Sequence, residues 1–229
     1  MTTRTTATEL AKGPQAAFAP MTGEGERRLA TTLFNLLAEG EPVEIGRLAQ
    51  AAGRQETEVV ADLAKPPFEP LVYRDRGGRV VGFGGLGVAA LGETRHRLQL
   101  DGRELYAWCA EDALFLPIVL NREVRVESSC PVTGERISLT VSPEGFTDLE
   151  PSGAVMSFLD PPAFEARGEE SWGGDVIRNG CHFIHFFASN EVAQAWISEH
   201  PGTLQLAIED GFEVGRRWVA YAFGVGPDR

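Results

Sequence analysis

The sequence is short of positive charge and has no long apolar run. Lysine and arginine number 21 against 33 aspartates and glutamates, so the formal net charge is −12 and the pI is near 4.8. Nucleic acids and anionic lipids bind positive surfaces that displace their counterions, so this charge balance argues against either as a partner. Every apolar run is far shorter than the about 18 residues that cross a bilayer, and we expect no membrane segment.

Cysteine is also scarce. Three cysteines at wide spacing do not suggest a disulfide framework and suit a reducing cytoplasm, where we expect the protein to reside. Residues 1–20 carry two cations and no apolar segment of the kind found in secretory signals. We therefore predict that residues 1–22 form a disordered tail. Each of the three thiols needs its own explanation.

The next part of the chain has a helical pattern. Apolar residues at near-helical spacing predict helices over 23–39, 42–52 and 56–65. Short apolar segments at 71–73 and 79–83 flank a Gly-rich turn and predict a β-hairpin. Three helices followed by a hairpin are typical of a winged helix, so we interpret residues 23–88 as a winged-helix-like domain. Its helices are acidic, which disfavours DNA binding, and fold alone does not determine function.

Residues 82–87 read Gly-Phe-Gly-Gly-Leu-Gly and match the G-x-G-x-x-G pattern of dinucleotide sites. Such a site needs a helix that begins at the glycines, whereas the alternating residues after Gly92 predict another strand. We therefore expect no dinucleotide here.

Residues 89–229 show a mixture of strand and helix patterns, which we interpret as a catalytic domain. Strands are predicted over 94–100, 124–128, 137–141, 154–159 and 181–188, and helices over 104–120, 190–199 and 204–224. The expected fold class is α+β, with an antiparallel sheet and helices packed together after the winged-helix-like domain.

A thiol and a carboxylate lie three residues apart in the stretch from Tyr106 to Asp112. If this stretch is helical, Cys109 and Asp112 share a face, so Asp112 could take a proton from the thiol and later return it. The alternative is a buried structural cysteine in an apolar helix, which is common. These residues alone do not decide between the two.

Two other uses of the cysteines fit the sequence less well. If residues 181–188 form a strand, Cys181 and His185 lie on one face and His182 on the other. A zinc site could combine Cys109, Cys130 and Cys181 with a histidine, but the chain has no C-x-x-C pair and its cysteine spacings match no usual zinc pattern. A papain-like triad with His182 or His185 and Asn190 lacks the local signature around the cysteine.

Four motifs in order carry a resemblance to a known family. They are Ala-Trp-Cys-Ala-x-Asp at 107–112, Ser-Ser-Cys-x-x-Thr-Gly at 128–134, Ser-Leu-Thr-Val-Ser-Pro at 138–143 and Cys-His-x-x-His-Phe-Phe-Ala-Ser at 181–189. From about Leu105 to Trp196 the chain closely resembles the bacterial organomercurial lyases, also called alkylmercury lyases. The stretch 160–179 looks longer than in that family.

The resemblance implies roles for individual residues. Cys109 and Cys181 would be the two catalytic cysteines that bind mercury, Asp112 the catalytic aspartate, and Cys130 a structural cysteine. Trp108 and Tyr106 would line the site. The resemblance implies three further properties: no organic cofactor, a hydrocarbon and Hg(II) as products, and transfer of Hg(II) to mercuric reductase or to small thiols, with external thiols needed for turnover.

Two other functions remain open from the sequence. A non-catalytic soft-metal sensor or metallochaperone would use the same cysteines, with the winged-helix-like domain meeting DNA or a partner. Asp112 argues against it, because a binding site has no need of a carboxylate beside its thiol. A relative that has drifted to another organometallic compound or to plain thiol chemistry is the third possibility.

Overall fold

The computed structural model describes residues 6–92, 94–166 and 176–225. Its helices are α1 (Ala7–Leu10), α2 (Lys12–Ala17), α3 (Glu24–Leu37), α4 (Ile45–Ala52), α5 (Glu56–Leu63), α6 (Ala110–Leu120), α7 (Pro161–Ala166), α9 (Val176–Asn179), α10 (Asn190–Ser198) and α11 (Ile208–Phe223). Its strands are β1 (Val72–Arg74), β2 (Val80–Phe83), β3 (Leu86–Gly87), β4 (His96–Leu100), β5 (Arg103–Ala107), β6 (Val124–Ser129), β7 (Arg136–Ser142), β8 (Gly145–Glu150), β9 (Val155–Leu159), β10 (Phe186–Phe187) and β11 (Thr203–Ala207). Short 3₁₀ turns lie at Glu69–Leu71 and Cys181–Phe183.

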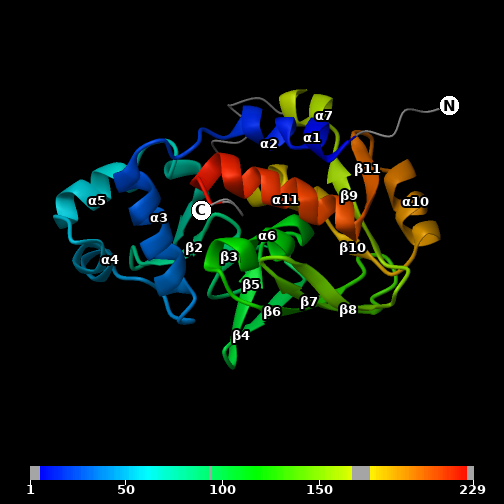
Figure 1. Ribbon diagram of the computed structural model, residues 1–229, viewed down its shortest axis with the longest axis horizontal. Coiled ribbons are helices and arrows are strands. Elements are labelled where there is room, and N and C mark those ends of the chain that lie inside the picture. The colour runs from blue at the N-terminus through cyan, green and yellow to red at the C-terminus, as the bar shows by residue number, and fades with distance from the viewer. Residues whose placement is uncertain (1–5, 93, 167–175, 226–229) are drawn as a thin grey trace.

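Two antiparallel sheets form the framework. The larger has eight strands in the order β1-β2-β3-β5-β4-β6-β7-β8, and the smaller has the order β10-β9-β11. Helix α6 lies between α11 and the larger sheet, and α3, α4 and α5 form a group beside it (Figure 1). Helices and antiparallel sheets packed in this way confirm the predicted α+β class with an N-terminal helical region. None of the described helices is long and apolar enough to cross a membrane.

The larger sheet crosses the boundary expected after residue 88. The hairpin β1-β2 pairs onward to β3, where Phe83 lies opposite Leu86, and Leu86 in turn lies opposite Ala107 of β5. The helical region and the remainder of the chain therefore share one continuous sheet. The Gly-rich stretch supplies the turn between β2 and β3, and no helix begins there.

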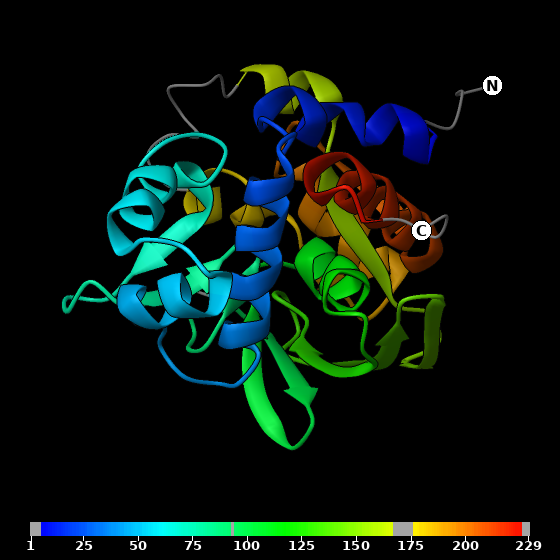
Figure 2. The ribbon, with the colours of Figure 1, turned by 60° about the vertical axis from the view of Figure 1, so that its left-hand side comes forward.

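The disordered tail predicted for residues 1–22 is wrong from residue 6 onward. Thr6 caps α1, and the side chain of Leu10 is fully buried. The Tyr221 hydroxyl of α11 donates a hydrogen bond to the carbonyl of Gln15 at 3.0 Å, and Met21 N–H donates one to Ala222 O at 2.9 Å. Helices this short gain their stability by packing on another element, which the local sequence pattern does not reveal. Both views place α1 and α2 over α11 (Figures 1 and 2).

Three predicted elements have the wrong type over part of their length. The helix expected over 104–120 is strand β5 followed by α6, and the one expected over 204–224 is β11 followed by α11. The strand expected over 181–188 is a 3₁₀ turn followed by the short β10. Short apolar runs fit a strand as well as a helix, and here pairing decides: β5 lies between β3 and β4, and β11 pairs with β9.

Candidate active site

The end of β5 and the start of α6 hold Cys109. Its backbone is extended, with φ −146° and ψ 179°, so Cys109 is the N-cap of α6 and Asp112 is the third residue of the helix. Asp112 Oδ2 accepts a hydrogen bond from Cys109 N–H at 2.8 Å. The expected placement of both residues on one face within a helix is therefore wrong. They are neighbours because they form a capping box.

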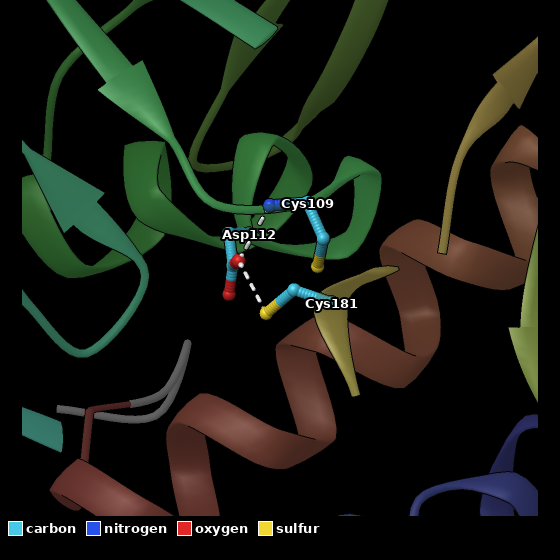
Figure 3. Close-up of side chains that lie close together, drawn as sticks. All are labelled: Cys109, Asp112 and Cys181. Atoms are coloured by element: carbon cyan, nitrogen blue, oxygen red, sulfur yellow. Dashed lines mark hydrogen bonds between the residues drawn. The ribbon is translucent and has the colours of Figure 1, made fainter. Parts of the chain in front are cut away.

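Cys181 completes a cluster with these two residues. It begins the 3₁₀ turn before β10, and its thiol donates to Asp112 Oδ2 at 3.7 Å. The two sulfurs and a carboxylate oxygen all lie within 4.8 Å of one another, and all three residues are buried. Figure 3 shows both thiols and the carboxylate pointing into the same space. The structure thus brings Cys181 to Cys109 and Asp112, which lie about 70 residues earlier in the sequence.

The Gly-rich turn covers the carboxylate. Gly85 has a φ of +98°, and a Cβ there would lie 2.5 Å from Asp112 Oδ1. The Gly85 carbonyl also accepts a hydrogen bond from Trp108 N–H at 2.9 Å. Only glycine fits this conformation and this close approach. The G-x-G-x-x-G pattern is therefore explained by a turn that packs against Asp112.

A small apolar cavity of about 80 Å³ lies against the cluster. Trp108 lines it, as the resemblance implies, and so does Phe115. Pro14 and Phe18, from the segment predicted to be disordered, line it as well. Tyr106 does not line it, contrary to expectation, because its hydroxyl donates to Glu104 Oε1 at 2.6 Å on an exposed face.

Burial changes the acidity of both groups in the capping box. It raises the pKa of Asp112 to about 6, although hydrogen bonds from the two cysteines partly oppose the shift. Burial also raises the pKa of Cys109 well above its usual value, and the hydrogen bond to Cys181 and the negative charge of Asp112 add to this shift. At neutral pH Cys109 is therefore a thiol beside a largely ionised carboxylate.

Sequence reasoning missed a second carboxyl group at this cavity. Glu111 is 6% exposed, and neither of its carboxylate oxygens has a hydrogen-bond partner among the described residues. Burial raises its pKa well above the usual value, and the charge of Asp112 adds to this. The signal that could have revealed Glu111 is a charged residue in an otherwise apolar helix.

Cys130 lies outside the cluster. It is 1% exposed, and its backbone makes two turn hydrogen bonds, to Glu135 O and from Gly134 N–H. Burial acts to raise its pKa, but hydrogen bonds from Thr133 and nearby backbone groups outweigh this and lower it.

The histidines are also absent from the cluster. In the described parts of the chain, only one group of three or more histidine, cysteine, aspartate or glutamate side chains lies close enough together to hold a metal ion. It consists of Cys109, Asp112 and Cys181. The zinc hypothesis, which needed Cys130 and a histidine beside the other two cysteines, therefore does not match the geometry.

Comparison with known proteins agrees with the motifs and the geometry. The family model described as alkylmercury lyase matches residues 90–220, and the one described as the helix-turn-helix domain of alkylmercury lyase matches residues 11–84. The chain is 38% identical to an alkylmercury lyase of Staphylococcus epidermidis over 85% of its length and 83% of that protein. It is 36% identical to the Pseudomonas putida enzyme over 82% of this chain and 81% of that one.

A solved structure has the same fold. The crystal structure of the mercury-bound form of MerB2 matches 92% of this chain and 97% of its own, with a TM-score of 0.70 and 28% identity. The chain therefore belongs to the alkylmercury lyase family, and it is an enzyme whose substrates are organomercurials.

Proposed function

We propose that the enzyme cleaves the carbon–mercury bond by protonolysis, with Cys109 and Cys181 as the mercury ligands and Asp112 as the proton carrier. The observation that carries the proposal is the cluster itself: two thiols and one carboxylate within 4.8 Å in a buried apolar site. Mercury(II) is a soft cation, and thiolates are its preferred ligands. Coordination also removes the thiol proton, which overcomes the high pKa that burial gives Cys109.

Two protons leave the thiols in the complete reaction. The organomercurial carries an anionic ligand on mercury, and the sulfur of one cysteine replaces that ligand. The first proton leaves together with the displaced anion. The second thiol loses its proton to Asp112, whose Oδ2 lies 3.7 Å from Cys181 Sγ. The carbon–mercury bond then breaks with its electron pair on carbon, and Asp112 returns the proton to that carbon. The products are a hydrocarbon and Hg(II) held by two thiolates.

The surroundings of the cluster favour this proton transfer. A carboxyl group with an ordinary pKa near 4 is a weak base, whereas burial raises the pKa of Asp112 to about 6 and makes it a better one. The cavity wall is mostly apolar and excludes water, which would otherwise compete for the proton. Nucleophiles and acid both come from the chain itself, so the proposed reaction needs no organic cofactor. We expect external thiols or mercuric reductase to remove Hg(II).

The test is to incubate the purified protein with phenylmercuric acetate and excess thiol and to measure benzene. Benzene release in repeated turnovers supports the proposal. Mercury that stays bound with no benzene formed would favour the soft-metal sensor or metallochaperone instead. Cys130→Ala provides the matched control for the active-site cysteines, because that thiol is equally buried but lies outside the cluster.

A further inference from the structure

Cys181 also lines a second cavity. Its volume is about 440 Å³, and all four histidines of the chain line it: His96, His182, His185 and His200. Arg95 lines it too. Cavities that bind small molecules are typically of this size, with a few polar groups that fix the ligand. None of these five polar residues belongs to the Cys109–Asp112–Cys181 cluster.

Cys181 and Trp108 line both cavities. The cluster therefore has two different neighbours: a small apolar cavity of about 80 Å³ and the larger cavity lined by histidines. The apolar cavity suits the organic group of the substrate, whereas a polar reactant would be better solvated in the histidine cavity. Of the two active-site cysteines, Cys181 is the one that lines the histidine cavity.

The protein as a whole is acidic, but the residues that line the histidine cavity carry a net positive charge. Burial lowers the pKa of His96 to about 3 and that of His185 to about 4, and the charge of Arg95 contributes to both shifts. These two imidazoles are therefore neutral at neutral pH, and they offer hydrogen bonds without charge. Among the described residues that line this cavity, Arg95 is the only permanently charged group, and none carries a carboxylate. The cavity thus favours an anion.

One polar atom there is unused. Nδ1 of His185 is buried and has no hydrogen-bond partner among the described residues. By contrast, Nδ1 of His96 lies 3.0 Å from Ser128 Oγ, and Nδ1 of His200 lies 2.6 Å from Trp196 O. A bound ligand with a polar group would satisfy His185, as buried polar atoms generally require.

From these observations we infer that the histidine cavity binds a small carboxylate-bearing thiol, which removes Hg(II) from Cys181. The inference rests on the proposed function, since it assigns the step that follows bond cleavage. Arg95 pairs with the carboxylate of the incoming thiol, and that pairing places the thiol sulfur near Cys181. A guanidinium is suited to this role because its planar fork matches a carboxylate.

The exchange is balanced in atoms and protons. The incoming thiol loses its proton as its sulfur bonds to mercury, the bond from mercury to Cys181 Sγ breaks, and Cys181 is protonated. A second thiol displaces Cys109 in the same way. The two protons lost by the incoming thiols equal the two gained by the cysteines, and no atom is oxidised or reduced. The product is a bis(thiolate) of Hg(II).

The test follows mercury release alone. The full chain is loaded with Hg(II), and its release is measured against the concentration of mercaptosuccinate, 2-mercaptoethanol or cysteamine, which are anionic, neutral and cationic thiols. We expect Arg95→Gln to raise the half-saturating concentration of mercaptosuccinate about fivefold, as loss of one exposed ion pair would, and to leave that of 2-mercaptoethanol nearly unchanged. Arg95→Glu should reverse the order of mercaptosuccinate and cysteamine.

Arg97→Gln is the matched control, because Arg97 is exposed on β4 and does not line the histidine cavity. A uniform change for all three thiols, no change, or the same selective effect in Arg97→Gln would overturn the inference. Benzene formation in a single turnover, with enzyme in excess and no external thiol, should be unchanged in Arg95→Gln. Absence of benzene from the unaltered protein would instead contradict the proposed function and leave the mercury-release test standing.

Discussion

The backbone N–H of Cys109 donates a hydrogen bond to the carboxylate of Asp112 at 2.8 Å. The same carboxylate therefore caps α6 and faces the thiols of the proposed reaction. The hydrogen bond orients Oδ2 and lowers the pKa of Asp112 somewhat, against the larger effect of burial. A structural motif and a proton carrier are thus combined in one side chain.

Removal of either clustered thiol should abolish catalysis. We expect Cys109→Ala and Cys181→Ala each to lower benzene release by at least about 10³-fold, since one thiolate cannot provide the two-sulfur coordination that weakens the carbon–mercury bond. Benzene release under single-turnover conditions is the measurement. Turnover by either variant at near the unaltered rate would contradict the two-thiolate mechanism.

Replacement of Cys130 should affect stability and spare the reaction. Cys130→Ala removes a buried sulfur and its hydrogen bonds in the turn between β6 and β7, which should lower the free energy of unfolding by about 1 to 3 kcal/mol. Denaturant unfolding and benzene release measure the two effects separately. If a fully folded Cys130→Ala protein were inactive, the structural role would be wrong.

A methyl group at Gly85 should disturb Asp112. In Gly85→Ala the new Cβ would lie 2.5 Å from Asp112 Oδ1, so the carboxylate or the turn must shift, and we expect kcat to fall about tenfold or more. Gly78→Ala is the matched control, because Gly78 also has a positive φ of +82° but has open space around its Cβ position. The Gly78→Ala protein should lose stability, because alanine at a positive φ strains the backbone there as it does at residue 85, but it should keep its activity. Equal kinetic loss in both variants would rule out a specific effect on Asp112.

The rate should follow the ionisation of Asp112. Burial raises its pKa to about 6, so the carboxylate is protonated below that pH and ionised above it. Only the ionised form accepts the thiol proton, and kcat/KM should therefore fall about tenfold for each pH unit below about 6 and level off above about 7. The pH profile of benzene release tests this. The residual activity of Asp112→Asn should lack that acidic limb, and a persistent limb would assign it to another group.

Local patterns in the sequence predicted much of the fold. The α3, α4 and α5 helices and the hairpin β1-β2 match expectation because each has clear apolar spacing and a turn signal. The helix expected over 104–120 is present only as α6; its first residues belong to β5, because their pairing with β3 and β4 makes them a strand. Likewise α1 and α2 are too short to be stable alone and depend on α11.

The order of four motifs was enough to identify the family and to single out Cys109, Asp112 and Cys181 as candidate site residues, because the order and type of residues are properties of the chain itself. Only the tertiary structure decided how they meet. Cys181 is brought to Asp112 by the packing of the turn before β10 against α6, Gly85 covers the carboxylate, and Phe18 helps line the apolar cavity. Periodicity and motifs report local conformation and chemistry, whereas burial, pKa and the second cavity beside Cys181 arise from contacts between residues far apart in sequence.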